Sequence, residues 1–451
     1  MLVKISVENF KSFQDATELT MISSNKIRTN ASHRLKIKST QLLKYGVVYG
    51  ANASGKTNLV EFFRFFKKCV SGGIPMEAVQ MFCKNREQNK ERESNFEMQF
   101  TVGDKFYAYG FSAVLSKRKI TAEWLYELYQ NGTAHCLFER EGNKRPVLDE
   151  SINLSGAEKT KFDIYADDFE GNETVLFLTE MNRGKKYTQD SKLIFFKNVF
   201  EWIQNHICII TPNTPLIDLE YYYDNESLQL INKLIETFDT GISTVNIEEI
   251  TLDELSNVMP PAVFDKAMTH LKNKVEENEN GHYRMTMRSQ ESFFSIEVNG
   301  HEEPKVTTIR LHHNKSFYDF GFEEESDGTR RLFDLMDMLL NKRNDVLYVV
   351  DELERSLHPK LTEHFLKLFM ELHEEQKMQL LFTTHESSIM DQSVFRRDEI
   401  WFVERNTENA SNIYSLDRFK ERYDKVLSKA YLEGRYGAIP VFSAFKFRGE
   451  E

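Results

Sequence analysis

The sequence has few cysteines, and no two of them are spaced as C-x-x-C. Cys69, Cys83, Cys136 and Cys208 lie far apart in a chain of 451 residues. Zinc clusters and disulfide frameworks both need closely grouped thiols, so this spacing argues against either. We expect four reduced thiols that pack as small hydrophobic side chains.

Long apolar runs are also absent. No stretch approaches the roughly 20 consecutive apolar residues that span a bilayer. The N-terminal sequence MLVKISVENFKSFQDATELTM alternates apolar and polar residues, as a pair of strands does, and it has no apolar core of a signal peptide. These absences predict a cytoplasmic protein with no membrane contact.

An excess of positive charge is missing too, since 58 Lys and Arg face 70 Asp and Glu for a net charge of -12. This balance excludes a surface that is basic all over, but it leaves room for a local basic groove, so nucleic-acid binding stays open.

Sustained heptads are absent, which argues against a long coiled coil. A hydrophobic content of 40% is enough for one large core or two moderate ones.

The order of predicted elements favours an α/β fold with antiparallel hairpins. A strand at 42–50 runs through a glycine-containing loop into a helix, and hairpins turn at Gly103-Asp104 and Asn131-Gly132. Helical patterns dominate residues 191–277, a third hairpin follows at 293–311, and strands and helices then alternate. We predict a domain that is interrupted by an α+β, mainly helical insertion. The predicted divisions are an N-terminal part at 1–115, the insertion at 116–300 and a C-terminal part at 301–451.

The strongest motif is GANASGKT, Gly50 to Thr57, which fits G-x-x-x-x-G-K-[ST] between a strand and a helix. Glycines let backbone N–H groups wrap an anion at a helix N-terminus, Lys56 adds charge toward the β- and γ-phosphates, and the Thr57 hydroxyl is a Mg²⁺ ligand. The alternative is a glycine-rich turn with a surface lysine. The predicted ATP contacts are residues of this loop and of the helix start: Gly50, Asn52, Ala53, Ser54, Gly55, Lys56, Thr57 and Asn58.

Two adjacent acids, Asp351 and Glu352, follow the strand-like run LYVV at residues 347–350. Neighbouring carboxylates at the end of a buried strand repel each other and resist desolvation, unless a cation or a proton-transfer task accounts for them. With a phosphate loop in the same domain, we expect Asp351 to hold Mg²⁺ and Glu352 to orient or deprotonate the attacking water. The alternative is a solvated loop opening.

His385 ends the next predicted strand, in LLFTTH. Parallel strands present their carboxyl ends at the ligand-binding edge of a sheet, so we expect His385 to hydrogen-bond the γ-phosphate. Ser326 and Gly328 of ESDGT open a helix shortly before the acidic strand, and they offer a hydroxyl and a flexible backbone to an anion. Each has a plainer structural alternative, a core histidine in the first case and a helix cap in the second.

The order of these motifs resembles ABC-class ATPases of the SMC and RecF kind. The resemblance implies an ABC-class P-loop ATPase head in which Ser326 and Gly328 contact the γ-phosphate bound to a second protomer, and 356–359 form the D-loop. ESDGT departs from the usual L-S-G-G-Q and keeps only its serine and one glycine. A Q-loop glutamine is not fixed, since Gln80 and Gln99 both qualify.

A closer resemblance covers both ends of the chain, in NFKSF, YGANASGKTNLVEF, VVDELERSLHP and residues 383–440. These segments look like the AAA15-type group of bacterial ATPases described as AbiL-, Rlo- or PARIS-like, with the ATPase part of OLD proteins as a further relative. The resemblance implies anti-phage defence with a phage-encoded trigger and a separately encoded effector, such as a Toprim-type nuclease. Only a short tail follows His385 and its next strands, so we expect no fused Toprim domain.

We therefore expect a slow ATPase that uses ATP and Mg²⁺, forms at least a dimer through its heads and controls a partner protein. Its catalytic residues would be Lys56, Glu352 and His385, with Thr57 and Asp351 at the metal. Two alternatives stay open: a DNA-binding repair ATPase of the RecF or SMC kind, and a nucleotide-binding module that does not hydrolyse.

Overall fold

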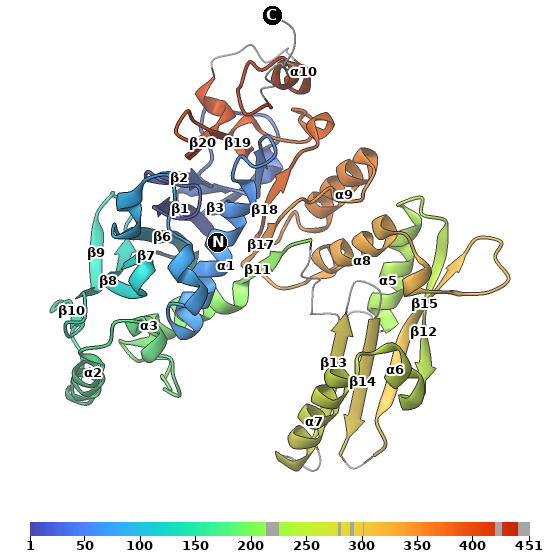
Figure 1. The fold of residues 1–451 in the computed structure, drawn as a ribbon, viewed down its shortest axis with the longest axis horizontal. Coiled ribbons are helices and arrows are strands. Elements are labelled where there is room, and N and C mark those ends of the chain that lie inside the picture. Colours follow the sequence, from blue (N-terminus) through green and yellow to red (C-terminus); the bar gives the residue numbers. More distant parts are fainter. Residues whose placement is uncertain (213–224, 278–280, 289–292, 301, 420–425, 441–451) are drawn as a thin grey trace, which may run out of the picture. The chain divides into compact units, whose positions relative to one another are not determined.

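The fold comes from a computed structural model, which describes residues 1–212, 225–277, 281–288, 293–300, 302–419 and 426–440 (Figure 1). The chain forms two compact units. The first unit comprises Met1–Ile209, Arg343–Leu353 and His373–Glu451, and the second comprises Ile210–Lys342 and Glu354–Leu372. Each is described by itself below.

A six-stranded, largely parallel sheet forms the centre of the first unit. Its strands in spatial order are β11 (Ile207–Ile210), β17 (Val346–Val350), β18 (Met378–Thr384), β5 (Tyr45–Tyr49), β19 (Ile400–Arg405) and β20 (Ser411–Ser415). Strand β17 is parallel to β18, strands β18 and β19 are each parallel to β5, and β20 is antiparallel to β19. All residues of β17, β18 and β5 are buried, as their continuous apolar sequences require. The carboxyl ends of four strands therefore meet at one edge.

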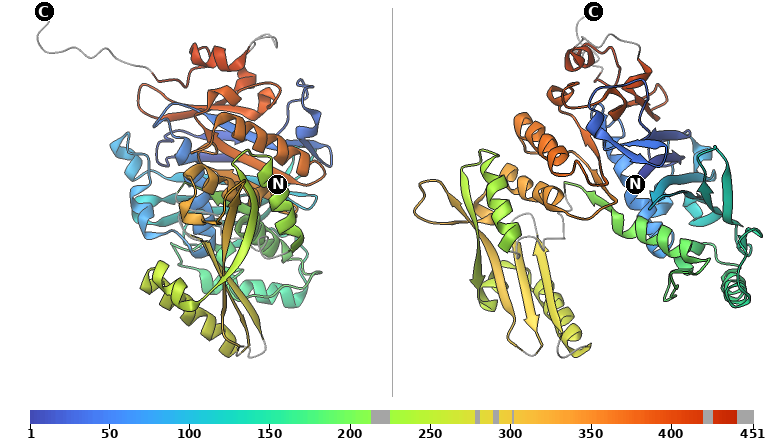
Figure 2. Two further views of the ribbon diagram at one scale, coloured as in Figure 1. Left: turned by 90° about the vertical axis from the view of Figure 1, so that its right-hand side faces the viewer. Right: turned by 180° about the vertical axis from the view of Figure 1, so that it is seen from behind.

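An antiparallel sheet of seven strands forms the second layer of this unit (Figure 2). Its strands in spatial order are β10 (Val147–Leu148), β9 (Ala134–Glu141), β8 (Lys119–Leu128), β7 (Lys105–Val114), β6 (Ser94–Val102), β1 (Leu2–Glu8) and β2 (Thr17–Thr20). The predicted N-terminal strand pair and the turns at Gly103-Asp104 and Asn131-Gly132 are confirmed.

Helix α1 (Lys56–Gly72) packs its aromatic face against that sheet. Phe62, Phe63 and Phe66 are fully buried, as their helical spacing predicts. The Phe66 ring centroid lies 5.5 Å from that of Phe111 on β7. The helix thus couples the parallel sheet, from which it starts, to the antiparallel sheet that it covers.

The first unit also contains further short strands and helices. They are β3 (Arg34–Ile37), β4 (Thr40–Leu43), α2 (Gly156–Phe169), α3 (Phe177–Glu180), α4 (Ile194–Glu201) and α10 (Leu427–Leu432). The four cysteines form no disulfide. Cys69 and Cys83 are buried, whereas Cys136 and Cys208 are partly exposed. Among the described residues, no helix has the length and apolar character needed to span a bilayer.

The second unit has a sheet of its own, covered by helices. The strands are β12 (Ile242–Ile250), β15 (Lys305–His313), β14 (Phe293–Asn299), β13 (His282–Arg288) and the short β16 (Phe320–Gly321), which pairs with β15. The helices are α5 (Asn225–Glu236), α6 (Leu252–Val258), α7 (Pro261–Glu277), α8 (Asp327–Leu340) and α9 (Pro359–Leu372). Leu271 of α7 packs in a core with Ile296 and Val306 of the sheet.

The fold class is the mixed α/β one that the sequence predicts, with the antiparallel hairpin at 293–311 present as β14 and β15. Strand β12 was not expected, since it lies among the helical patterns of residues 191–277. Only Ile242 and Val245 of its nine residues are buried, so its apolar alternation is weak. The strand depends on pairing with β15, more than 50 residues later in the chain.

Candidate functional site

The phosphate-loop sequence forms a tight turn between β5 and α1. Gly55 has φ +117°, and a Cβ atom there would lie 2.8 Å from Ser12 Oγ. A Cβ atom at Gly50 would lie 2.6 Å from Ser54 Oγ. Ala53 also has a positive φ, +60°. The loop therefore needs glycine at both motif positions, and its backbone conformation is left-handed at two places.

Two serines distant in sequence hold this loop. The Ser411 hydroxyl lies 2.5 Å from the Ser54 carbonyl oxygen and 2.7 Å from Ser12 Oγ. Asn58 Nδ2 donates to Ser12 Oγ over 2.7 Å. Ser12 belongs to the NFKSF segment, whereas Ser411 begins β20. Neither was predicted, because a serine 38 or more residues from the motif gives no local signal.

Lys56 is buried and bridges the loop to the end of β18. Its Nζ donates to the carbonyl oxygens of Gly50 at 2.6 Å and Ala51 at 3.1 Å, and lies 3.3 Å from His385 Nδ1. Partial burial lowers the pKa of His385 below its ordinary value, and the Lys56 charge lowers it further. The predicted lysine and histidine are thus brought together, with the imidazole kept neutral beside the ammonium group.

Asp351 and Glu352 follow β17 at the same sheet edge. Asp351 is buried and its Oδ1 accepts a hydrogen bond of 2.7 Å from the Thr383 hydroxyl. The Thr383 hydroxyl in turn accepts the Glu352 amide N–H at 2.9 Å. Glu352 has φ +51°, a left-handed conformation that costs about 1 to 2 kcal/mol in a residue with a side chain. Such strain at an acidic residue is characteristic of functional sites.

A cavity of about 490 Å³ lies between the phosphate loop and the ends of the neighbouring strands. Its lining consists of residues 52–58 together with Glu352, His385 and Arg405. Arg405 ends β19 and pairs in register with Ser411. Its side chain is exposed and makes no ion pair among the described residues, so it supplies a second positive charge to the cavity. No local pattern marks Arg405 in the sequence, because only the parallel pairing of β19 with β5 places it here.

A second cavity, of about 320 Å³, shares Asn58 and Arg405 with the first. Lys11, Ser12, Gln80, Phe82, Lys84, Asn85 and Asn409 complete its lining. Gln80, one of the two Q-loop candidates, thus lies beside the phosphate loop. The other candidate, Gln99, lies on β6 and donates to Glu97 over 3.0 Å.

Ser326 and Gly328 belong to the second unit, where local structure accounts for both. Ser326 is the N-cap of α8, and its Oγ accepts the Thr329 N–H at 3.1 Å. A Cβ atom at Gly328 would lie 2.5 Å from the Ser356 carbonyl oxygen. The α8 N-terminus and the start of the 356–359 segment therefore pack closely, and the proposed contact of Ser326 and Gly328 with nucleotide stays a prediction.

The residues at the sheet edge fit a nucleoside triphosphate with Mg²⁺. Hydroxyl and carboxylate oxygens, here from Thr57 and Asp351, are ligands that this hard cation prefers. Among the described residues, no group of three or more His, Cys, Asp or Glu side chains forms a metal site. Such a sparse protein donor set is usual for Mg²⁺, which takes further ligands from phosphates and water.

Comparison with protein-family models finds similarity to an AAA domain. Residues 212–391 match the family model described as "AAA domain, putative AbiEii toxin, Type IV TA system". This range contains the acidic pair and His385 but begins after the phosphate loop. No curated protein matches the chain.

Two of the similar solved structures are heads of SMC proteins. The crystal structure of an SMC head bound to the C-winged helix domain of ScpA has a TM-score of 0.37 at 14% identity, covering 92% of this chain and 97% of that chain. The SMC head domain from Thermotoga maritima has a TM-score of 0.35 at 14% identity, covering 92% of this chain and 98% of that chain.

The phosphate loop between β5 and α1, and the acidic pair and histidine at the neighbouring strand ends, are features that P-loop ATPase domains share. The part of the chain at residues 212–391 is, further, similar to AAA domains.

Proposed function

We propose that the protein is an ATP-binding and ATP-hydrolysing subunit of a bacterial anti-phage defence system. It acts in the cytoplasm, assembles through ATP-bound heads and controls a separately encoded effector, such as a Toprim-type nuclease. The observation that carries the ATPase assignment is the 3.3 Å approach of Lys56 Nζ to His385 Nδ1 in a cavity that Glu352 also lines.

Each side chain at this edge has a distinct task. Backbone N–H groups of the loop and Lys56 bind the phosphates. Thr57 and Asp351 hold Mg²⁺, which neutralises phosphate charge when bound. Glu352 orients the attacking water and accepts its proton, and neutral His385 hydrogen-bonds the γ-phosphate. Thr383 fixes the relative positions of the two acids.

Assembly is proposed to occur through nucleotide shared between protomers. Ser326 and Gly328 of one protomer would contact the γ-phosphate held by a second protomer, so that ATP joins two heads. The division into an N-terminal head part at 1–115, an insertion at 116–300 and a C-terminal head part at 301–451 belongs to this proposal.

The defence role rests on the resemblance of the motifs to AAA15-type ATPases and is supported by the family match, whose description names a toxin of a toxin–antitoxin system. A phage-encoded trigger and an effector encoded nearby follow from the same resemblance. A second candidate is a RecF- or SMC-like DNA-binding ATPase in repair, which the basic segment at residues 26–38 favours.

The test has two parts. In the first, purified protein should hydrolyse ATP with Mg²⁺, and the Lys56→Ala variant should lose this activity. In the second, the tagged protein is co-expressed with its neighbouring gene, and it should retain the product of that gene in a native complex whose mass is measured. Absence of hydrolysis in the parent protein would refute the ATPase assignment. Hydrolysis by a lone dimer that retains DNA would support the repair function instead.

A further inference from the structure

A stretch near the N-terminus is strongly basic within an acidic chain. No Asp or Glu occurs between Glu18 and Glu61, although the chain has 70 of them in 451 residues. Five cations fall in a span of 13 residues: Lys26, Arg28, Arg34, Lys36 and Lys38. Four of the five side chains are exposed, and Arg34 is half-buried. We call these five residues the basic hairpin surface.

The β3–β4 hairpin separates its apolar and cationic residues between two faces. Leu35 and Leu42 face each other across the hairpin and pack with Ile37 in a buried cluster. Lys36 pairs with Gln41 on the opposite face, and Arg34 donates to Gln41 Oε1 over 2.8 Å. The cations therefore project away from the core, from a strand whose register the apolar face fixes.

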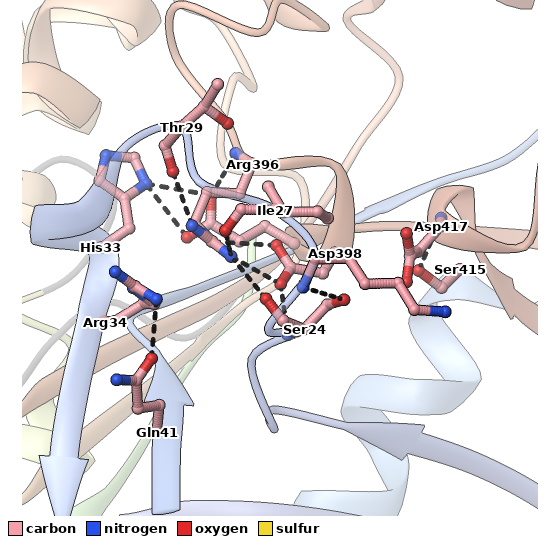
Figure 3. Close-up of polar contacts among 12 residues, drawn as sticks. Ser24, Ile27, Thr29, His33, Arg34, Gln41, Arg396, Asp398, Ser415 and Asp417 are labelled. Carbon is pink, nitrogen blue, oxygen red and sulfur yellow. Dashed lines mark hydrogen bonds and ion pairs between the residues drawn. The ribbon is translucent and has the colours of Figure 1, made fainter. Parts of the chain in front are cut away.

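The loop that carries Lys26 and Arg28 is held by a buried arginine (Figure 3). Arg396, which is fully buried, donates to the carbonyl oxygens of Thr29 at 2.6 Å, Ile27 at 3.2 Å and Ser24 at 3.4 Å. Asp398 accepts from Arg396 at 2.9 Å and from the Ser24 N–H at 2.7 Å. The buried Arg396 and Asp398 thus fix the backbone of a loop whose outward side chains are cationic. The loop backbone therefore loses little conformational entropy when these side chains bind a partner.

The cations of this surface lack acidic partners. None of the five makes an ion pair with a carboxylate in the described part of the chain, although the protein as a whole has more acids than bases. The nearby acids Asp398 and Glu399 are buried and are bonded by Arg396 and His33. The surface therefore carries uncompensated positive charge that a polyanion would neutralise.

The surface lies away from the phosphate loop. Strand β4 leads into the amino end of β5, and Arg396 and Asp398 precede the amino end of β19. Because the phosphate loop follows the carboxyl end of β5, the basic hairpin surface belongs to the opposite edge of the parallel sheet. Its cations are therefore not part of the nucleotide site.

We propose that the basic hairpin surface binds the phosphate backbone of double-stranded nucleic acid, without sequence preference. Residues 22–44 contain no Phe, Tyr or Trp, so the surface lacks the aromatic platforms on which single-stranded bases stack. Only Ile22 among its large apolar residues is substantially exposed, which is too little for insertion into a membrane. Exposed cations within a short stretch of sequence, without aromatic platforms or a large apolar patch, suit the phosphate backbone of a duplex.

Duplex binding is tested by fluorescence anisotropy of a labelled 24-base-pair DNA with the nucleotide-free full chain, over a range of salt concentrations. The affinity should fall steeply with salt. The variant Lys36→Gln/Lys38→Gln should bind roughly tenfold more weakly at low salt and reduce the slope of log K against log salt by about 2, since each lost phosphate contact removes about 0.9.

The matched control is Lys266→Gln/Lys272→Gln, which makes the same charge change at exposed positions of α7. It should bind as the parent does, and thermal unfolding should show both variants folded. Equal losses in the two variants, tighter binding of single-stranded DNA, or binding only to anionic vesicles would each overturn the proposal. Because no nucleotide is present, the outcome is independent of whether the protein hydrolyses ATP.

Discussion

The Thr383 hydroxyl joins the ends of two neighbouring strands, because it donates to Asp351 Oδ1 over 2.7 Å while accepting the Glu352 amide at 2.9 Å. One buried side chain on β18 thereby sets both the orientation of the predicted metal ligand and the strained backbone of the predicted base. Without it, Glu352 would lose a contact that stabilises its positive φ.

Thr383→Val should keep the shape of the side chain and remove this hydrogen bond. We expect ATP hydrolysis to fall 10- to 100-fold with a higher requirement for Mg²⁺, as for other residues that orient metal ligands. Steady-state rates over a Mg²⁺ titration measure the effect. Thr383→Ser retains the hydroxyl and should restore most of the activity, and an unchanged rate in the valine variant would contradict the assignment.

Glu352→Gln should separate binding from hydrolysis. The amide keeps the size of the side chain but cannot accept a proton, so the rate should fall by about 10²-fold or more while ATP and Mg²⁺ still bind. Single-turnover hydrolysis together with equilibrium binding of labelled ATP measures the two quantities. Parental turnover in this variant would show that another group acts as the base.

The pH dependence of hydrolysis should reflect His385. Burial and the Lys56 charge lower its pKa below 6.5, against the opposing effect of Glu352 and Asp351. The imidazole stays neutral until the pH falls below 6.5, so the acid limb of activity should lie below that value and be absent in His385→Gln. The unfolded chain binds this proton first, so stability should also decrease as pH falls through 6.5. A limb centred above pH 6.5 would contradict this interpretation.

Arg405→Gln should weaken binding in proportion to the charge of the nucleotide. The guanidinium lines the phosphate-loop cavity, so its loss should reduce affinity for ATP more than for AMP, by roughly 10-fold for a lost charge-assisted hydrogen bond. Competition binding with ATP, ADP and AMP measures the difference. A uniform loss for all three nucleotides would indicate a purely structural role.

Gly55→Ala should abolish ATP binding and destabilise the fold by about 1 to 3 kcal/mol, because a Cβ atom would meet Ser12 Oγ at 2.8 Å on a backbone with φ +117°. Urea denaturation and ATP binding measure the two effects. Gly72→Ala, near the end of α1, is the control. A Cβ atom there meets nothing within 4 Å, so the substitution should be neutral or slightly stabilising.

Elements with strong local signals were predictable. The apolar spacing of Phe62, Phe63 and Phe66 predicts α1, and the Asn131-Gly132 turn predicts the hairpin of β8 and β9. Strand β12 escaped prediction, since its few buried residues give little alternation and its existence depends on the distant β15. The local sequence pattern predicts an element when the segment has a buried apolar face of its own. It does not predict an element that forms only by pairing with a distant strand.

By itself, the sequence determined the phosphate loop, the acidic pair after a buried strand and the histidine after the next strand, because each depends on a few consecutive residues. Tertiary structure alone decided that Ser12 and Ser411 brace the loop, that Thr383 links Asp351 to Glu352, and that Arg405 enters the cavity. Those contacts join residues that lie 31 to 399 positions apart in the sequence. The order of strands in the sheet brings them together, and packing of the whole domain fixes that order.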